Sequence, residues 1–482
     1  MTAGRSSPAH RSVSDAVLRE LGATHGGPGA LALLTAGQHT LRLLQLRALL
    51  DAVAETPGPV AVRCRRHWAL LEAADRADRE AARRVLFYPL VGPWLRRCLR
   101  RLGTAATEAT SSEHEAELTR ELAHLGALAA AAAVRAGLPF TLRLGAAEGL
   151  GDDDVLTLPT LGALGVPGTT GLHFDGRLLT VTPEHGAPAA IRRHPDGTWR
   201  SDDPRWSPLR VLTGGPRPVL LDEIDPFRTA DSGLERHGLR PGDRMGADEP
   251  EQWQSAWDGA LPMIALGGPV RTDEVAALLD CLVPLAPPPG AVPYGGAAAH
   301  CSGTRREAFG AVLSSTPRTP AYLAATLVHE LQHAKLSALT DLVPLHTAGP
   351  RQRYWAPWRP DPRPFDGLLQ GAYSHLALAE YWQLFALGAK DAAERDKAWA
   401  EHSRCREQVG AALPSLAGSQ SLTREGRVFV GAMVRQLTRL KDHPPPQGHL
   451  ARASAYVETA RRMWRRQTSG GEPPVYVPSR GI

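Results

Sequence analysis

Apolar residues recur at helical spacing along the first third of the chain. Over residues 13–143, leucine and alanine return every three or four positions, and the pattern is interrupted by residues 26–29 and 56–59. This spacing places apolar side chains on one face of a helix. We therefore expect an N-terminal bundle of about four or five helices, given ordinary helix lengths, with one of them over residues 115–136.

The pattern changes between residues 142 and 228, where short β-type runs alternate with Gly, Pro and Asp turns. A small β-sheet is expected there. His194 begins a His-Pro-Asp-Gly sequence, which is typical of a turn, so we interpret this histidine as a turn residue rather than a metal ligand. The predicted strands cover residues 178–181, 190–192, 209–212 and 219–221.

The remainder of the chain is predicted to be mainly helical up to residue 467. A short strand over residues 308–313 is expected to precede one long helix. The other expected elements are a loop (232–248), two helices (251–260 and 272–283), a Pro/Gly-rich surface segment (286–296) and a loose tail (468–482). The predicted fold class is therefore α+β and mostly α-helical, with regions 1–140, 141–300 and 301–467 ahead of the tail.

Composition narrows the class of protein. The chain has 482 residues, enough to bury a large core, and its five cysteines are widely spaced, which argues against a zinc ribbon or a disulfide framework. A cytoplasmic location without a membrane span is expected, because no signal peptide or long apolar run is found. A net charge of +5 is too small to argue for nucleic acid. Local arginine clusters are interpreted as solvated helix faces, with an acidic-peptide or nucleic-acid patch as the alternative.

The long predicted helix follows Thr319, and nothing breaks it before Pro344. Residues 329–333 read His-Glu-Leu-Gln-His. Because His329 and His333 are four residues apart, their imidazoles project from nearly the same side of the helix and can reach one ion. Two histidines buried without a ligand would be costly. The sequence therefore predicts a zincin-like metal helix.

Glu330 is the candidate catalytic residue beside this pair. It lies about 100° around the helix from His329, which directs its carboxylate toward the open face of the metal. In a zinc metallopeptidase this carboxylate would deprotonate the metal-bound water. A residue such as Tyr354 would then stabilise the oxyanion.

A third protein ligand is needed to complete the site. The compact zincin spacing is absent, because Leu336 and Leu339 stand where its glycine and third histidine would be. The ligand must therefore come from farther along the chain. The candidates are Asp341, His346, Asp361, Asp366, His375 and Glu380.

His375 and Glu380 share a predicted helix over residues 365–387. They are five positions apart, about 140° around the axis, so both cannot readily bind one ion. Gly371 and Ala379 flank His375 and would let the helix approach its partner closely, which favours His375. Glu380 remains open, since two histidines with one carboxylate are the common iron arrangement.

Three segments together resemble the actinobacterial HEXXH-motif proteins of ribosomal-peptide (RiPP) maturation. They are HELQHAKL (329–336), RYWAPWRPDPRP (353–364) and GLLQGAYSH (367–375). The resemblance is specific over residues 320–387 and only general elsewhere. It implies an Fe(II) and 2-oxoglutarate-dependent peptide β-hydroxylase rather than a protease, acting on a ribosomally synthesised precursor peptide.

The same resemblance implies roles for individual residues. Carried over position by position, the iron ligands are His329, His333 and His375, and Glu330 becomes a hydrogen-bonding neighbour of the metal. It suggests Asp or His as the modified residue of the peptide, without distinguishing them. Three protein ligands suit a six-coordinate ion that also binds 2-oxoglutarate through two oxygens and leaves one position for dioxygen.

The distal carboxylate of 2-oxoglutarate needs a cation. Arg359 and Arg363 lie in the proline-rich loop just before the third-ligand helix, and a guanidinium suits a carboxylate. The alternative is that they stack on Trp355 or Trp358 and hold the loop. The strand expected near residues 309–313 could pair with an extended substrate, or it could be an ordinary sheet edge.

Two rival functions stay open at this point. One is the zinc metallopeptidase with Glu330 as general base. The other is a non-catalytic peptide-binding protein that uses a metal ion for stability.

Overall fold

A computed structural model describes most of the chain. It covers residues 13–55, 58–105, 112–145, 155–166, 168–230, 239–242, 244–287, 301–350 and 354–468. Residues 231–238 and 243 of the predicted loop, residues 288–300 around the predicted surface segment, and residues 469–482 of the predicted tail lie outside the described residues.

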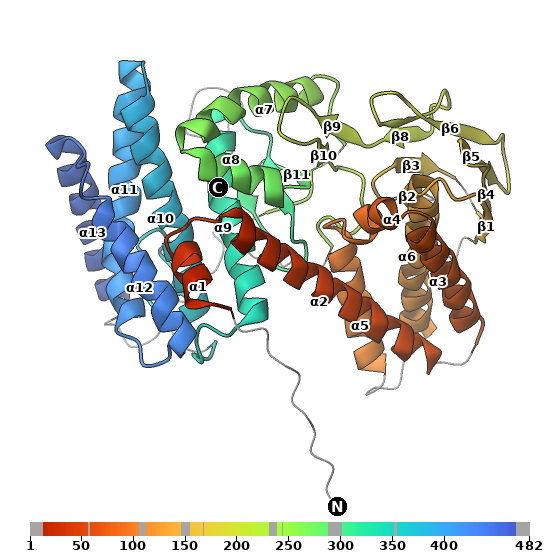
Figure 1. The fold of residues 1–482 in the computed structure, drawn as a ribbon, viewed down its shortest axis with the longest axis horizontal. Helices are drawn as coiled ribbons and strands as arrows, with labels where there is room; N and C mark the ends of the chain where they lie inside the picture. The colour runs from red at the N-terminus through yellow and green to blue at the C-terminus, as the bar shows by residue number, and fades with distance from the viewer. Residues whose placement is uncertain are drawn as a thin grey trace, which may run out of the picture. The chain divides into compact units, whose positions relative to one another are not determined.

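Six helices precede the first strand in the described part of the chain, against the four or five expected (Figure 1). They are α1 (Asp15–Gly22), α2 (Pro28–Ala54), α3 (Pro59–Ala77), α4 (Arg79–Leu86), α5 (Val91–Ala105) and α6 (Ser112–Arg135). Helices α3, α4 and α5 all pack against α6. Its buried alanines allow this close approach, because they leave little side-chain volume between the helices.

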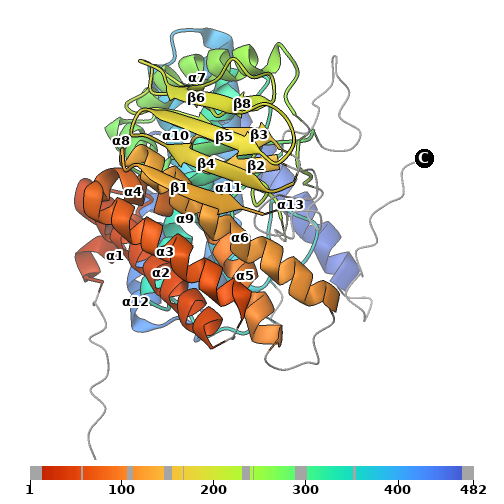
Figure 2. The ribbon, with the colours of Figure 1, turned by 90° about the vertical axis from the view of Figure 1, so that its right-hand side faces the viewer.

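Two antiparallel sheets follow the helices, and Figure 2 shows β6, β5, β4 and β1 side by side. The larger sheet has the order β1-β4-β5-β6-β7 and the smaller has the order β2-β3-β8. The larger consists of β1 (Phe140–Leu144), β4 (Thr170–Phe174), β5 (Leu178–Pro183), β6 (Ala189–Arg193) and β7 (Trp199–Arg200). The smaller consists of β2 (Val155–Leu158), β3 (Gly162–Gly165) and β8 (Trp206–Pro208). His194 lies in the predicted turn, where its carbonyl accepts a hydrogen bond from the Gly197 amide at 2.9 Å.

A third sheet is mixed and has the order β12-β13-β11-β10-β9. It consists of β9 (Arg210–Leu212), β10 (Val219–Leu221), β11 (Cys281–Leu285), β12 (Ser302–Gly303) and β13 (Ala311–Ser315). The strand predicted over residues 308–313 is β13, and it pairs with β11 on one side and β12 on the other. It therefore lies between two strands and is not the expected edge strand, although β12 pairs only with Leu313 and Ser314. Pairing of this strand with a substrate stays a prediction.

The helix predicted over residues 272–283 divides into two elements. Helix α8 (Pro269–Leu278) ends early, and the next buried residues form β11. The short apolar run has no periodicity that separates helix from strand, so pairing with β10 and β13 decides it. Helix α7 (Glu249–Leu266) extends beyond its predicted end at residue 260.

The C-terminal part is helical, as predicted. It contains α9 (Pro320–Leu342), α10 (Phe365–Gly388), α11 (Ala392–Ala417), α12 (Arg424–Arg439) and α13 (Gln447–Thr468). Helix α10 packs along both α9 and α11, and α1 packs against α12. The mostly helical α+β class expected from the sequence is confirmed. No helix among the described residues has the length and apolarity needed to cross a bilayer.

The chain packs into two compact units, and neither is one continuous stretch. Unit 1 contains Met1–Gly37, Asp258–Leu278 and Thr319–Ile482, and unit 2 contains Gln38–Trp257 and Leu279–Arg318. Two of the four boundaries fall inside α2 and α7, and the others fall at the end of α8 and just before the helix that begins at Pro320. The division into regions 1–140, 141–300 and 301–467 therefore stays a prediction. The proposed metal helix and the third-ligand helix both belong to unit 1.

Candidate metal centre

Helix α9 is buried on every side except one stripe. Thr319 caps it, accepting a hydrogen bond from the Tyr322 amide, as its position before Pro320 predicts. Most of its side chains are buried, whereas Ala325, His329, His333 and Ser337 are half-buried. These four residues follow one another at a spacing of four, so they form one line along the helix. The two histidines of the motif therefore lie on the accessible face of an otherwise buried helix.

The imidazoles of His329 and His333 converge. Their Nε2 atoms are 3.1 Å apart and their ring centroids 4.8 Å apart. Two nitrogens bound to one ion at about 2.1 Å lie about 3.0 Å apart in octahedral geometry and about 3.4 Å apart in tetrahedral geometry. At this distance one ring can donate a hydrogen bond to the other. The separation also lies within the range of two ligands to one metal ion.

His375 comes from α10 and lies next to this pair. Its ring centroid is 5.4 Å from that of His329. Its Nδ1 is 2.8 Å from the Gly371 carbonyl oxygen, so the ring donates there and keeps its Nε2 lone pair for a ligand. The position favoured by helical facing is thus adjacent to the motif.

A second contact orients His333. Its Nδ1 is 2.9 Å from Oε1 of Gln370, whose Nε2 is 3.5 Å from the Ser337 hydroxyl. A donor bond from Nδ1 leaves Nε2 as the metal-binding atom, which is the usual arrangement around a ligating histidine. Gln370 stands within the motif GLLQGAYSH, but sequence reasoning assigned it no role. Its side chain, supplied by α10, orients the His333 ring by accepting a hydrogen bond from Nδ1.

The protonation state of the site suits metal binding. Burial, followed by the charges of His333 and His375, lowers the pKa of His329 well below its usual 6.5. Burial lowers the pKa of His375 to about 3, although the hydrogen bond to Gly371 opposes this. Both rings are therefore neutral near pH 7, and the neutral imidazole is the form that binds metal.

The donor set fits a metal, but the three rings do not yet surround a common point. Within the described residues no group of three or more His, Cys, Asp or Glu side chains is arranged to hold an ion. His329 and His333 have a separation that suits one ion, and the His375 ring is adjacent to that of His329. His329 also has a buried Nδ1 without a hydrogen-bond partner in the described part of the chain. The residues present suit a histidine-bound divalent ion.

Trp358 covers the third histidine. Its indole stacks on His375 with centroids 4.6 Å apart and an angle of 20° between the planes. A Cβ at Gly371 would come within 2.3 Å of the Trp358 ring. Gly371 was expected to let α10 approach a partner helix. Instead, its missing side chain makes room for the tryptophan that stacks on His375.

Gly371→Ala is therefore expected to displace Trp358 and lower the metal affinity. Overpacking of this kind costs about 1–3 kcal/mol in stability. The measurement is Co(II) binding followed by absorption, together with urea unfolding. Gly410→Ala on α11 is the matched control, because a Cβ there meets nothing within 4 Å and alanine favours the helix. Equal metal affinity in both variants would contradict this role of Trp358.

The other predicted ligands are engaged elsewhere. Glu380 Oε1 lies 2.8 Å from His25 Nε2, and its Oε2 lies 2.6 Å from a guanidinium nitrogen of Arg271. His346 contacts Phe365 edge to face, with ring centroids 4.8 Å apart. Of the remaining candidates, Asp361 pairs with arginines, while Asp341 and Asp366 are exposed.

Arg359 and Arg363 both pair with one carboxylate. Arg359 Nε lies 2.8 Å from Asp361 Oδ1, and a terminal nitrogen of Arg363 lies 3.5 Å from Asp361 Oδ2. Backbone hydrogen bonds between Tyr354 and Arg363 close the same loop. This arrangement agrees with a loop-holding role. Either arginine would have to exchange Asp361 for a co-substrate carboxylate.

Arg404 on α11 is a cation that sequence reasoning missed. Its positive charge contributes to lowering the pKa of both His329 and His375. Its guanidinium pairs with Glu401, and 45% of its side chain is exposed. No motif marked it, because it lies on a helix remote in sequence from the histidines. It is a further candidate for binding an anion beside the metal.

Glu330 is buried, with 3% of its surface exposed.

The other side of α9 carries Gln332 and Lys335, which are fully buried. Lys335 is about 200° around the helix from His333, so it points away from the metal face. A lysine in an otherwise apolar stretch of helix is the sequence signal that could have indicated buried polar contacts on this side of α9.

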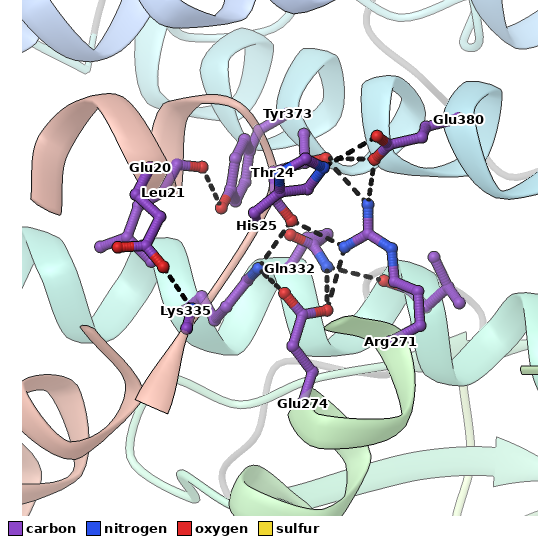
Figure 3. A network of polar contacts seen from close by, with 12 residues as sticks. Glu20, Leu21, Thr24, His25, Arg271, Glu274, Gln332, Lys335, Tyr373 and Glu380 are labelled. Carbon is purple, nitrogen blue, oxygen red and sulfur yellow. Dashed lines mark hydrogen bonds and ion pairs between the residues drawn. The ribbon is translucent and has the colours of Figure 1, made fainter. Parts of the chain in front are cut away.

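Behind the metal helix is a buried network of charges, drawn in Figure 3. Arg271 and Lys335 both bind Glu274, and Arg271 also binds Glu380. Two cations thus face two carboxylates, so the cluster is balanced, as a buried group of charges must be. Gln332 donates to Glu274 at 3.3 Å. The network connects α8, α9 and α10.

Thr24 joins the N-terminal segment to this network. Its φ angle is +66°, which is unusual for a β-branched residue. Its carbonyl oxygen accepts hydrogen bonds from Arg271 at 2.7 Å and Lys335 at 2.9 Å. Its hydroxyl donates to Glu380 at 3.1 Å. These bonds to buried charges hold the strained backbone in place.

Acid is expected to weaken unit 1 through Glu380. Burial alone would raise its pKa, but the hydrogen bond from His25 and the charge of Arg271 outweigh it and lower the pKa to about 2. A carboxylate with a depressed pKa stabilises the fold above its unfolded pKa near 4.5 and loses that contribution as the pH falls toward 2. Unfolding free energies measured across this window should decline less steeply in Glu380→Gln. Identical slopes would contradict the prediction.

Two comparisons with known proteins found no match. No family model matches the chain, and no curated protein sequence matches it significantly. Function has to be argued from the residues of this chain.

Proposed function

We propose that the protein is an Fe(II) and 2-oxoglutarate-dependent β-hydroxylase of a ribosomally synthesised precursor peptide. The main support for a metal site is the 3.1 Å separation of the His329 and His333 Nε2 atoms on the accessible stripe of α9. The choice of reaction rests on the sequence resemblance over residues 320–387. A site of three histidines is compatible with this reaction, because an iron ion can bind further ligands beside them.

The proposal gives each nearby residue a task. His329, His333 and His375 would hold the ion, with Gln370 and the Gly371 carbonyl fixing the ring nitrogens that face it. Bound iron and 2-oxoglutarate would supply the oxidising chemistry for a C–H bond of the peptide. Arg359, Arg363 and Arg404 are the candidate partners for the distal carboxylate.

The ligand preference of the site can be measured directly. Metal-free protein is titrated anaerobically with Fe(II), and succinate is then quantified after addition of 2-oxoglutarate and oxygen, with and without peptide. Co-expression with short peptides encoded by neighbouring genes provides the substrate. We expect succinate to form in step with a peptide product heavier by one oxygen atom.

The zinc metallopeptidase predicts another set of results. Zinc alone would then support peptide cleavage, 2-oxoglutarate would be inert, and Glu330→Gln would abolish turnover because the general base is lost. Cleavage by the zinc-loaded protein without any succinate would overturn the hydroxylase proposal.

A further inference from the structure

A cleft in unit 2 has the properties of a second binding site. Its volume is about 510 Å³, and it lies between α4, the end of α6 and the five-stranded antiparallel sheet. Ligand sites commonly have volumes of about 300–1,000 Å³. The residues that define it are Arg84, Arg135, Arg177, Arg193, Phe174 and Trp199.

The lining carries an excess of positive charge. Four arginines line the cleft, against the carboxylates of Asp78 and Glu80. Asp78 caps α4 through the Ala81 amide, and Glu80 pairs with Arg84 at 2.8 Å. Both carboxylates therefore have partners of their own.

The arginines are close enough to affect one another. Burial, followed by the charges of Arg84 and Arg193, lowers the pKa of Arg135 to about 10. Arg135 donates two hydrogen bonds to Thr160, through Nε at 2.7 Å and a terminal nitrogen at 2.5 Å. Arg177 and Arg193 are exposed, and the ion pairs among the described residues give neither an acidic partner. An anion in the cleft would relieve this repulsion.

Trp199 forms part of the wall of the cleft. Only 4% of its surface is exposed, and its Nε1 has no hydrogen-bond partner within the part of the chain that the structure describes. Trp199 pairs across the sheet with Arg193, so the two side chains lie on the same face of the sheet.

The shape of the site favours a peptide over a nucleic acid. Phe174 and Trp199 are almost fully buried, so neither ring offers an open face on which a base could stack. The guanidinium groups come from α4, α6, β6 and the turn before β5, which spreads them over several positions. Spaced carboxylates along a chain match arginines that are spread in this way.

We infer that this cleft binds an acidic segment of a peptide, with Arg84, Arg135, Arg177 and Arg193 receiving carboxylates. That the peptide is the precursor itself rests on the proposed function. The cleft would then recognise a part of the precursor that is not modified. Its affinity for carboxylates does not depend on the metal centre.

Binding is tested with metal-free, full-length protein and a fluorescein-labelled octapeptide of alternating glutamate and serine, followed by fluorescence anisotropy. The double variant Arg177→Glu/Arg193→Glu should bind it at least about tenfold more weakly, because two attractive charges become repulsive. Circular dichroism checks that each variant is folded.

The matched control is Arg192→Glu. Arg192 is adjacent to Arg193 but faces the other side of β6, opposite Arg200. It should bind like the unmodified protein. A labelled octapeptide with glutamine in place of each glutamate is the control ligand. The proposal is overturned if the double variant binds normally, if Arg192→Glu weakens binding equally, or if this uncharged peptide binds as tightly. It is also overturned if inorganic phosphate alone binds as tightly as the acidic peptide.

A kinetic measurement separates this inference from the proposed function. If the hydroxylase proposal is correct, the double variant should raise KM for a precursor with an acidic segment and leave turnover of a truncated peptide unchanged. If no succinate forms with any peptide, the proposed function fails, and the anisotropy result still decides whether the cleft binds acidic peptide.

Discussion

His333→Ala is expected to abolish turnover and to lower metal affinity by more than about a hundredfold, since even loss of a second-shell partner costs 10–100-fold. Its Nε2 is one of two nitrogens that already have the separation of metal ligands. The variant should remain folded, because His333 is half-buried on the open stripe of α9. Metal content after dialysis, succinate formation and circular dichroism measure the three effects.

His194→Ala is the control for this experiment, because that histidine is exposed in the turn before β7. It should keep full metal content and activity. A folded but inactive His333→Ala protein would favour the enzyme. Unfolding of this variant would instead favour a non-catalytic protein in which the metal serves stability. Unchanged metal content would remove His333 from the site altogether.

Glu274→Ala is expected to be the most destabilising change in unit 1. The substitution leaves Arg271 and Lys335 buried without their shared carboxylate, and each has only 1% of its side chain exposed. Breaking a buried ion pair by removing one partner costs about 3–5 kcal/mol. Urea unfolding should register this loss as a large fall in midpoint.

Two controls distinguish lost pairing from lost packing. Glu274→Leu combined with Lys335→Met removes both charges of this ion pair. The double variant should recover part of the stability, because Lys335 no longer leaves a buried charge without its partner. Arg47→Ala removes an exposed ion pair with Asp51 on α2 and should leave the midpoint unchanged. The prediction fails if Glu274→Ala unfolds at the same urea concentration as the Arg47 variant.

These two experiments examine opposite faces of one helix. His329 and His333 lie on the accessible stripe of α9, whereas Gln332 and Lys335 anchor its other side in the charge network. A rigid support is what a metal site requires, since ligand nitrogens must be held to within a fraction of an ångström. We therefore expect the folded fraction of Glu274→Ala to bind metal less tightly as well.

Local patterns in the sequence were sufficient to predict α9 and the placement of its two histidines on one side. Thr319 before Pro320, an unbroken helical pattern and a spacing of four residues all act within one element, so no tertiary information was needed. The mostly helical α+β class followed in the same way from apolar periodicity. The strands β5, β6, β9 and β10 also fall on the predicted runs.

Tertiary packing decided what the same patterns left open. Helical facing ranked His375 above Glu380, but only the fold shows that Glu380 is bound by Arg271 and His25 while His375 lies beside His329. The last residues of the predicted helix, from Cys281 onward, instead form β11 because strand partners are available. The charge network, the Arg404 side chain and the unsatisfied Trp199 donor depend on residues far apart in the chain. Periodicity describes one element at a time, whereas pairing and burial are set by the elements that surround it.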